Sequence, residues 1–269
     1  MTPIAAHRLD FPDPEDELDF LDDHLPRLRA NLPRVRDNLG VGFDSAVARL
    51  GLRVALGHPA DALVAGMRSV VDWGVALFQR AGVDRDQPTT LAIDGETIVV
   101  PGGNSYFNSA PRWGVTAGVA MALCDDAALG RLCAFDVAWW GGEYDAWHNT
   151  YAEAVMAVAE ARADALDRLD QAAHAAAHAR RFPERGRLLG VPLMALARAV
   201  ETGDEAGFNQ HLADSLQAWR TVHRRGPDQR DPAGVLPLRT LGWCARARDR
   251  GLRLQVASGY LPAGLAPTD

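Results

Sequence analysis

The chain has 269 residues, of which 48% are hydrophobic, so it is long and apolar enough to bury a large core. It has no apolar run of about 18 residues and no basic, apolar leader, which argues against a membrane span and a signal peptide and predicts a cytoplasmic protein. The three cysteines form no C-x-x-C pair, which excludes a zinc ribbon, and all 28 basic residues are arginine, as is typical of a GC-rich bacterial genome.

Most of the excess negative charge lies near the N-terminus. The net charge is −7, yet Asp10 to Asp23 holds eight acidic residues and no basic one, so the rest of the chain is close to neutral. Acidic residues favour the first turn of a helix, and a solvated helix start is the favoured interpretation. The alternative is a surface that attracts a basic partner. Its candidate partner-binding residues are Asp13, Glu15, Asp16, Glu17, Asp19, Asp22 and Asp23.

The first hundred residues predict three helices and one β-hairpin. Leucines at steps of three and four predict a helix over 15–38, bent or divided by its prolines, and two more follow over 44–56 and 59–80. The sequence TLAIDGETIVV then alternates apolar residues on both sides of Asp94-Gly95, which predicts a hairpin with a two-residue turn.

Helical hairpins are predicted for most of the remaining chain. One pair covers 113–123 and 127–135, with Asp126 as the N-cap of its second helix. A single long alanine-rich helix is predicted over 144–180. A second pair covers 188–202 and 204–223, joined at Gly203-Asp204.

The C-terminal part predicts a further helix over 235–250 and a short strand over 252–256. The fold class is therefore mainly all-α, an array or bundle of antiparallel helical hairpins with one small β-hairpin insertion. No clear linker divides the chain, so the acidic segment 1–40 is expected to continue into one helical domain over 41–269.

Motifs for chemistry are sparse. His174 and His178 share a helix face, but no third ligand accompanies them, so we predict no metal site. Leu21–His24 and Leu166–Asp170 place carboxylates close together, yet they do not form the paired magnesium motifs of all-helical isoprenoid enzymes. No phosphate loop or nucleophile elbow occurs. We therefore predict no catalytic residue and no cofactor.

The polar residues of the segment 204–223 are assigned to three roles, namely a helix cap, one packing asparagine and a solvent face. Asp204 is the expected cap, and the buried stripe is formed by Phe208, Leu212, Leu216 and Trp219. Asn209 is predicted to bond a neighbouring backbone or side chain and fix the packing of the next element. The remaining polar residues, including His211 and His223, are assigned to a solvent face.

A family resemblance lies mainly in the C-terminal third. The order PLMALARAV, GD, EAGFNQHLADSLQAWRTVH, GVLPLRTLGWCARARDRGL and LQVASGYLPAGL resembles the immunity protein 49 family of bacterial polymorphic toxin systems, over about residues 41 to 265. The residues that match its pattern are Phe208, Asn209, Leu212, Leu216, Gly234, Leu238, Ser258, Tyr260, Leu261 and Pro262. The acidic segment and the HAAAH stretch lie outside the resemblance.

The resemblance implies an all-helical, non-enzymatic protein that binds and neutralises a cognate toxin, without direct nucleic-acid or membrane binding. We hypothesise that the acidic segment docks against the basic cleft of a toxin that acts on nucleic acid. Trp139, Trp140, Tyr144 and Trp147 are a second candidate surface, although filling of the core between hairpins is the favoured interpretation. The alternatives are an all-helical metal-dependent enzyme and a scaffold for a different protein partner.

Overall fold

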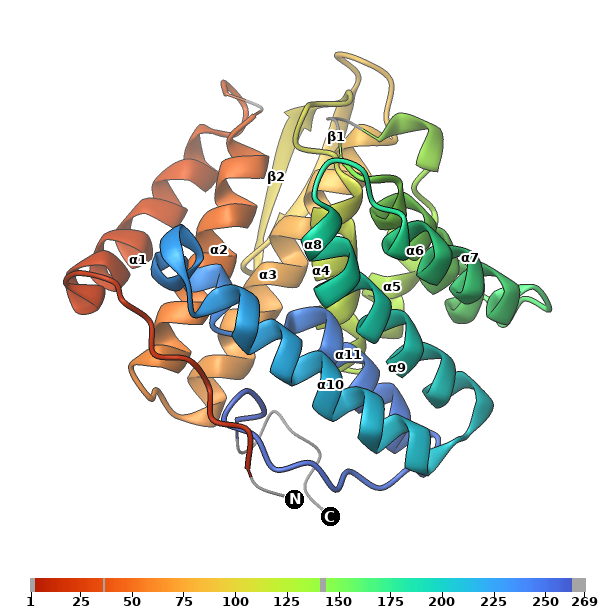
Figure 1. Cartoon of the computed structure of the whole chain (residues 1–269). Coiled ribbons are helices and arrows are strands. Elements are labelled where there is room, and N and C mark those ends of the chain that lie inside the picture. Colours follow the sequence, from red (N-terminus) through yellow and green to blue (C-terminus); the bar gives the residue numbers. More distant parts are fainter. Residues whose placement is uncertain (1–2, 36, 141–143, 263–269) are drawn as a thin grey trace.

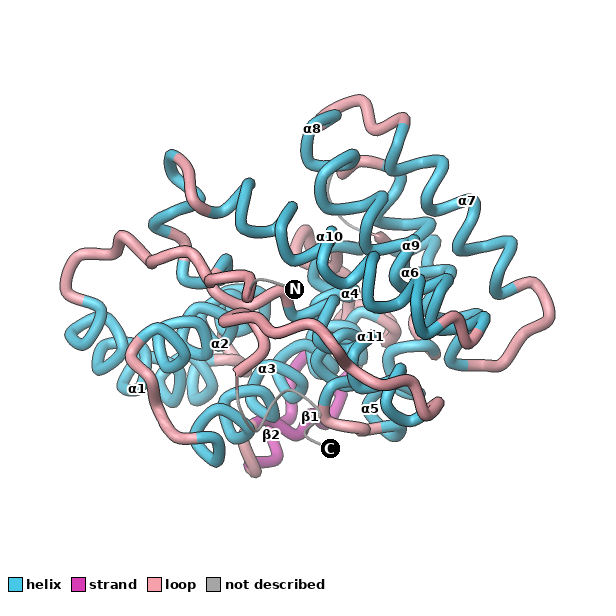
Figure 2. The backbone as a smooth tube through the Cα atoms, turned by 60° about the horizontal axis from the view of Figure 1, so that its bottom comes forward, coloured by secondary structure: helices cyan, strands magenta, loops and turns pink. Residues whose placement is uncertain are grey.

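A computed structural model describes residues 3–35, 37–140 and 144–262, and most of them are helical (Figure 1). Several pairs of helices that follow one another in the chain pack side by side (Figures 1 and 2). No helix in these ranges is long and apolar enough to cross a membrane. The helices are α1 (Pro14–Asn31), α2 (Asn38–Ala55), α3 (Ala60–Ala81), α4 (Ala110–Ala122), α5 (Asp126–Cys133), α6 (Ala146–Ala159), α7 (Ala165–Ala177), α8 (Pro183–Arg185), α9 (Val191–Thr202), α10 (Glu205–His223) and α11 (Leu238–Asp249). The mainly helical fold class is confirmed.

The first three helices form where the leucine period predicted them, with shifted bounds. Helix α1 ends at Asn31, before Pro33, as expected from the proline. Helix α2 begins at Asn38, six residues before the predicted start, and includes Gly42. A Cβ on Gly42 would lie 2.0 Å from the Trp73 side chain of α3, so this glycine serves close helix packing and does not mark a loop.

The predicted β-hairpin is confirmed. Strands β1 (Pro88–Ile93) and β2 (Glu96–Pro101) pair antiparallel, with Leu91 opposite Ile98. Asp94 and Gly95 have φ values of 50° and 79°, as a two-residue type I′ turn requires. The Asp94 carboxylate accepts hydrogen bonds from Trp73 Nε1 and Arg29 Nη1, which attaches the turn to α3 and α1.

The single long helix predicted over 144–180 is wrong, because the chain reverses after α6 and forms α7 beside it. Ala161 takes a left-handed φ of 52°, and Arg162 N–H donates to Ala157 O at 2.9 Å. Arg162 and Arg168 both pair with Asp164, which stabilises the turn. No glycine or proline marks this reversal, so the sequence carried no breaker signal.

Two smaller predictions are also wrong. The N-cap of α5 is Asp125, whose Oδ1 accepts from Ala128 N–H at 2.8 Å, one residue before the predicted cap. The predicted strand over 252–256 is an extended segment that pairs with no strand in the described chain. Its backbone is held by helix side chains, and only Ser258, just beyond it, forms an isolated bridge, with Ile4.

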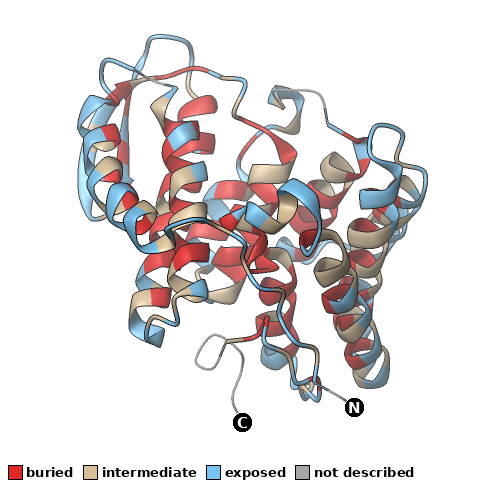
Figure 3. Ribbon diagram, turned by 60° about the vertical axis from the view of Figure 1, so that its left-hand side comes forward, coloured by how far each residue is buried: buried red, intermediate tan, exposed pale blue. Residues whose placement is uncertain are grey.

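Buried residues line the inward faces of the helices (Figure 3). Helices α4 and α11 cross closely, since a Cβ on Gly242 would lie 2.4 Å from Gly118 O. Beside it, Trp243 Nε1 donates to Tyr151 OH at 3.2 Å, and both side chains are fully buried. This glycine contact brings the N-terminal turn of α11 against α4 and α6.

Candidate functional site

The acidic residues lie on the outer side of α1 and just before it. Asp13, Glu15, Asp16, Asp19 and Asp23 are exposed, whereas Glu17 and Asp22 are partly buried. The opposite face of the helix buries its leucines against the core. The structure therefore brings the exposed carboxylates together on one surface.

Two of these carboxylates are already paired with arginines. The Asp22 carboxylate pairs with Arg53 at 2.9 Å and Arg49 at 3.3 Å, both on α2. Asp23 lies 3.6 Å from Arg27 on its own helix, where both side chains are highly exposed. Asp22 is thus a link between α1 and α2, and an exposed pair such as Asp23–Arg27 contributes little to stability.

The segment before α1 is attached to the C-terminal residues of the family pattern. Ile4 N–H donates to Ala257 O at 3.0 Å, and Gly259 N–H donates to Ile4 O at 2.9 Å. The buried Tyr260 hydroxyl accepts from His7 N–H at 2.9 Å. In Figure 1 this red segment meets the dark blue C-terminal segment, so Tyr260 helps to position the chain that leads into the acidic surface.

The four candidate aromatic residues do not form one surface. Trp147 is buried, and Trp140 is half-buried with its ring against Phe135 at a centroid distance of 4.9 Å. Only Trp139 and Tyr144 are exposed, by 38% and 36%. The aromatic group is therefore divided between core packing and surface.

Helix α10 confirms the predicted cap, and Asn209 makes the kind of bonds predicted for it. Asp204 Oδ1 accepts from Gly207 N–H at 2.9 Å. Asn209 Nδ2 donates to Arg253 O at 2.9 Å, and its Oδ1 accepts from Gln255 N–H at 2.7 Å. The stripe is buried except at Trp219, which is half-buried and donates from Nε1 to Gly234 O.

The assignment of His223 to a solvent face is wrong. Its side chain is 6% exposed and stacks beside the Trp219 ring at a centroid distance of 4.1 Å. Gly234 lies so close that a Cβ there would be 2.3 Å from His223 Nδ1. His223, in the last turn of α10, is covered by the loop that precedes α11. The helical period of the sequence does not predict this contact.

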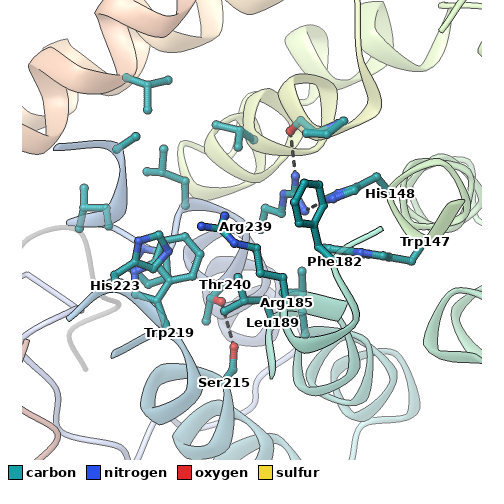
Figure 4. A pocket seen from close by; sticks show the side chains of 18 of the residues that line it. Trp147, His148, Phe182, Arg185, Leu189, Ser215, Trp219, His223, Arg239 and Thr240 are labelled. Carbon is teal, nitrogen blue, oxygen red and sulfur yellow. Dashed lines mark hydrogen bonds between the residues drawn. The ribbon is translucent and has the colours of Figure 1, made fainter. Parts of the chain in front are cut away.

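A cavity of about 620 Å³ lies between α4, α6, α9, α10 and the start of α11. Figure 4 shows Arg239 near its centre, His148 and Phe182 on one side, and Trp219 and His223 on the other. The lining includes exposed Tyr144, Phe182 and Arg185, so the cavity opens to solvent. It also includes Val47, Val115, Leu189, Leu193, Leu236 and Leu238, which make much of its wall apolar.

Arg239 is held in the cavity by contacts with α4 and α6. Its Nη2 donates to Pro111 O at 2.9 Å, and its Nη1 lies 3.4 Å from His148 Nδ1. The guanidinium also lies over the Trp147 and Tyr151 rings, at 5.6 and 5.4 Å from their centroids. Burial lowers the pKa of this guanidinium from its ordinary value.

Two histidines of the cavity are held neutral. Burial, with smaller contributions from Arg239 and Arg185, lowers the pKa of His148 to about 2. Burial is also the main reason that the pKa of His223 falls to about 4. Because neither ring is protonated near neutral pH, neither one adds positive charge to the cavity.

We expect His223 to make stability fall in acid. Its folded pKa of about 4 lies below the ordinary value of 6.5, so its contribution to stability is fully present above the unfolded pKa and is lost as pH falls through the folded one. The loss is about 3 kcal/mol at most. Thermal unfolding from about pH 7 to about pH 4 should show a smaller loss for His223→Gln than for the wild type. The control is His211→Gln on the same helix, where the side chain is only partly buried. Equal pH profiles for all three proteins would contradict the assignment.

Sequence reasoning missed the cavity. The available signal was Arg239 itself, a charged residue inside the apolar run GVLPLRTLGW. His148 and His223 carried no comparable signal, because their burial depends on which helices meet. Within the described ranges no group of three or more His, Cys, Asp or Glu side chains is placed to hold a metal ion.

Comparison with known proteins gives one match. The family model described as Immunity protein 49 matches residues 57–265, which is more than half of the chain. No curated protein and no solved structure matches. The matched range includes α10, α11, the cavity helices and the Tyr260 segment, and it begins after α1 and α2.

Proposed function

Because the chain belongs to the immunity protein 49 family, we propose that it protects a bacterium by binding and neutralising a cognate toxin. The observation that carries the proposal is the family match over most of the chain. The family is one of immunity proteins and not of enzymes, so the toxin is inhibited by a stable contact. The protein would act where the toxin acts, in the bacterial cytoplasm.

The acidic face of α1 is the contact surface that we propose. Phe20 is 55% exposed and stacks on His24 at a centroid distance of 5.0 Å. Exposed carboxylates flank it at Asp16, Asp19 and Asp23 along the same helix. An aromatic side chain within a charged rim is a common arrangement at protein interfaces. Such a surface suits the basic cleft of a toxin that acts on nucleic acid.

The charges at this surface also suit fast association. Opposite potentials steer two proteins together, and the effect weakens as salt screens the charges. The partly buried Asp22 is excluded from the proposed contact, because it already pairs with Arg49 and Arg53. Of the aromatic group, only Trp139 and Tyr144 are open to a partner and remain a second proposed contact.

We expect amide substitutions on α1 to weaken toxin binding. The variant carries Glu15→Gln, Asp16→Asn, Asp19→Asn and Asp23→Asn, and it leaves Asp22 intact. Surface plasmon resonance against the purified toxin domain should show an affinity about tenfold lower and a flatter dependence on salt, mainly through a slower association rate.

The matched control removes four exposed acids elsewhere, with Asp61→Asn, Asp126→Asn, Asp167→Asn and Glu184→Gln. It changes net charge equally and should bind with nearly wild-type affinity. If both variants weakened toxin binding equally, the loss would be an effect of net charge, and the proposed contact at α1 would be rejected. Absence of any complex with the wild-type protein would reject the immunity function itself.

A further inference from the structure

We propose that the cavity around Arg239 is a binding site for a small organic carboxylate, with the carboxylate paired to Arg239 and an apolar body against the surrounding walls. The inference depends on the cavity alone and not on toxin binding. It assigns a ligand site to the protein in addition to its proposed immunity function.

The first argument is the unused hydrogen-bonding capacity of Arg239. A guanidinium has five N–H donors, and here Nη2 donates to Pro111 O and Nη1 approaches His148. Across the described ranges no aspartate or glutamate pairs with Arg239. Arg239 is half-buried at the cavity, and a carboxylate matches the planar fork of its guanidinium.

The second argument is that neighbouring groups do not supply the missing anion. The Asp145 carboxylate accepts N–H groups from Arg180, Arg181 and Phe182, at 3.0, 2.7 and 2.9 Å. Asp231 Oδ1 accepts from Ala233 N–H at 2.9 Å. Both acids that line the cavity are thus bound to local backbone.

The other arginine of the cavity already has an acidic partner. Arg185 at the mouth pairs with Asp228, with an Nη2–Oδ1 distance of 2.6 Å, so this pair is neutral overall. His148 and His223 are neutral, and Arg239 and Arg185 both help to lower the pKa of His148. The positive charge that no acidic side chain contacts directly is therefore located at Arg239.

The third argument is the shape and chemistry of the space. A volume of about 620 Å³ lies within the range of small-molecule sites, roughly 300 to 1,000 Å³. Trp147 and Trp219 provide aromatic wall at opposite sides of Arg239 (Figure 4). Both ring nitrogens of His223 lack a hydrogen-bond partner among the described residues. A ligand with one carboxylate, an apolar body and one polar group fits these features.

The structure also shows why an arginine can occupy this position. A Cβ on Gly114 would lie 3.1 Å from both Arg239 Nε and the Tyr151 ring, so the glycine leaves room for the side chain. The Gly118–Gly242 contact sets the separation of the two helices. Arg239 is thus held in position before any ligand arrives, which lowers the entropic cost of binding.

The test measures binding of three probe acids, phenylacetate, 4-phenylbutyrate and decanoate, and of the neutral 4-phenylbutyramide. Tryptophan fluorescence and calorimetry on the full chain provide the dissociation constants. At least one acid should bind, and 4-phenylbutyrate should bind about tenfold more tightly than its amide, because a charged hydrogen bond is lost in the amide.

Arg239→Gln should abolish the preference for the acid, whereas Arg198→Gln, a surface arginine paired with Asp170, should preserve it. Leu189→Trp reduces the apolar space without changing Arg239 and should weaken binding about tenfold. If Arg239→Gln does not fold, the proposal is tested by the acid–amide comparison on the wild type and by the binding of the acids to Leu189→Trp. Equal binding of acid and amide, or no binding of the acids up to about 10 mM, would overturn the proposal.

Discussion

Replacing Gly242 with alanine is expected to cost about 3 kcal/mol or more in the free energy of unfolding. The added Cβ would lie 2.4 Å from Gly118 O and 2.9 Å from Gly118 Cα. Both contacts are to backbone, so no flexible side chain can move aside and α11 must shift away from α4. Chemical denaturation followed by circular dichroism measures the loss.

The matched control is Gly130→Ala in the middle of α5. A Cβ on Gly130 meets no other atom within 4 Å, and the residue is helical and exposed. Alanine there should stabilise the protein by about 0.5 to 1 kcal/mol, because it lowers the entropy of the unfolded chain. A stability for Gly242→Ala close to that of the wild type would show that the α4–α11 crossing is looser than described.

Asn209→Ala is expected to cost about 2 to 4 kcal/mol, because three hydrogen bonds are lost together. The amide donates to Glu205 O and Arg253 O and accepts from Gln255 N–H. Alanine leaves the Arg253 carbonyl and the Gln255 amide without this partner. Amide hydrogen exchange should therefore accelerate over 252–256, in addition to the loss of global stability.

Gln210→Ala is the control for this prediction. Gln210 is the next residue of the same helix, but it is exposed and bonds only Asp214 among the described residues. Its substitution should change stability by less than about 0.5 kcal/mol. Unchanged exchange over 252–256 in Asn209→Ala would contradict the role of this side chain in holding the C-terminal segment.

Local signals in the sequence predicted most helices and the hairpin correctly. The leucine period located α1 to α3, Asp94-Gly95 located the β-turn, and Gly203-Asp204 located the reversal before α10. Each of these signals depends only on residues close in the chain. The break between α6 and α7 was missed because Ala161 adopts a left-handed conformation that glycine normally signals.

The residues that line the cavity could be identified only from the three-dimensional structure. Asn209 could be predicted to bond a neighbouring segment, since a polar residue beside a buried stripe needs a partner. Arg239 and His223 could not be placed in the same way, because their surroundings come from helices far apart in the chain. The glycines that permit the α4–α11 contact likewise indicate close packing only once the partner helix is known.

The acidic segment shows a similar limit. Its charge was evident from the sequence, and the first helical turn does contain Glu15, Asp16 and Glu17. The sequence did not show that Asp22 pairs with arginines of α2 or that Tyr260 holds the preceding segment. These contacts divide the acidic residues into a structural link and an exposed surface.

The most direct test of the immunity function is co-expression of this protein with the toxin domain produced by the adjacent gene. Growth should be arrested by the toxin alone and restored by co-expression, with the two proteins purifying as a stable complex. Arrest that is unchanged by co-expression, in cells that contain the folded protein, would contradict the proposed neutralisation of that toxin.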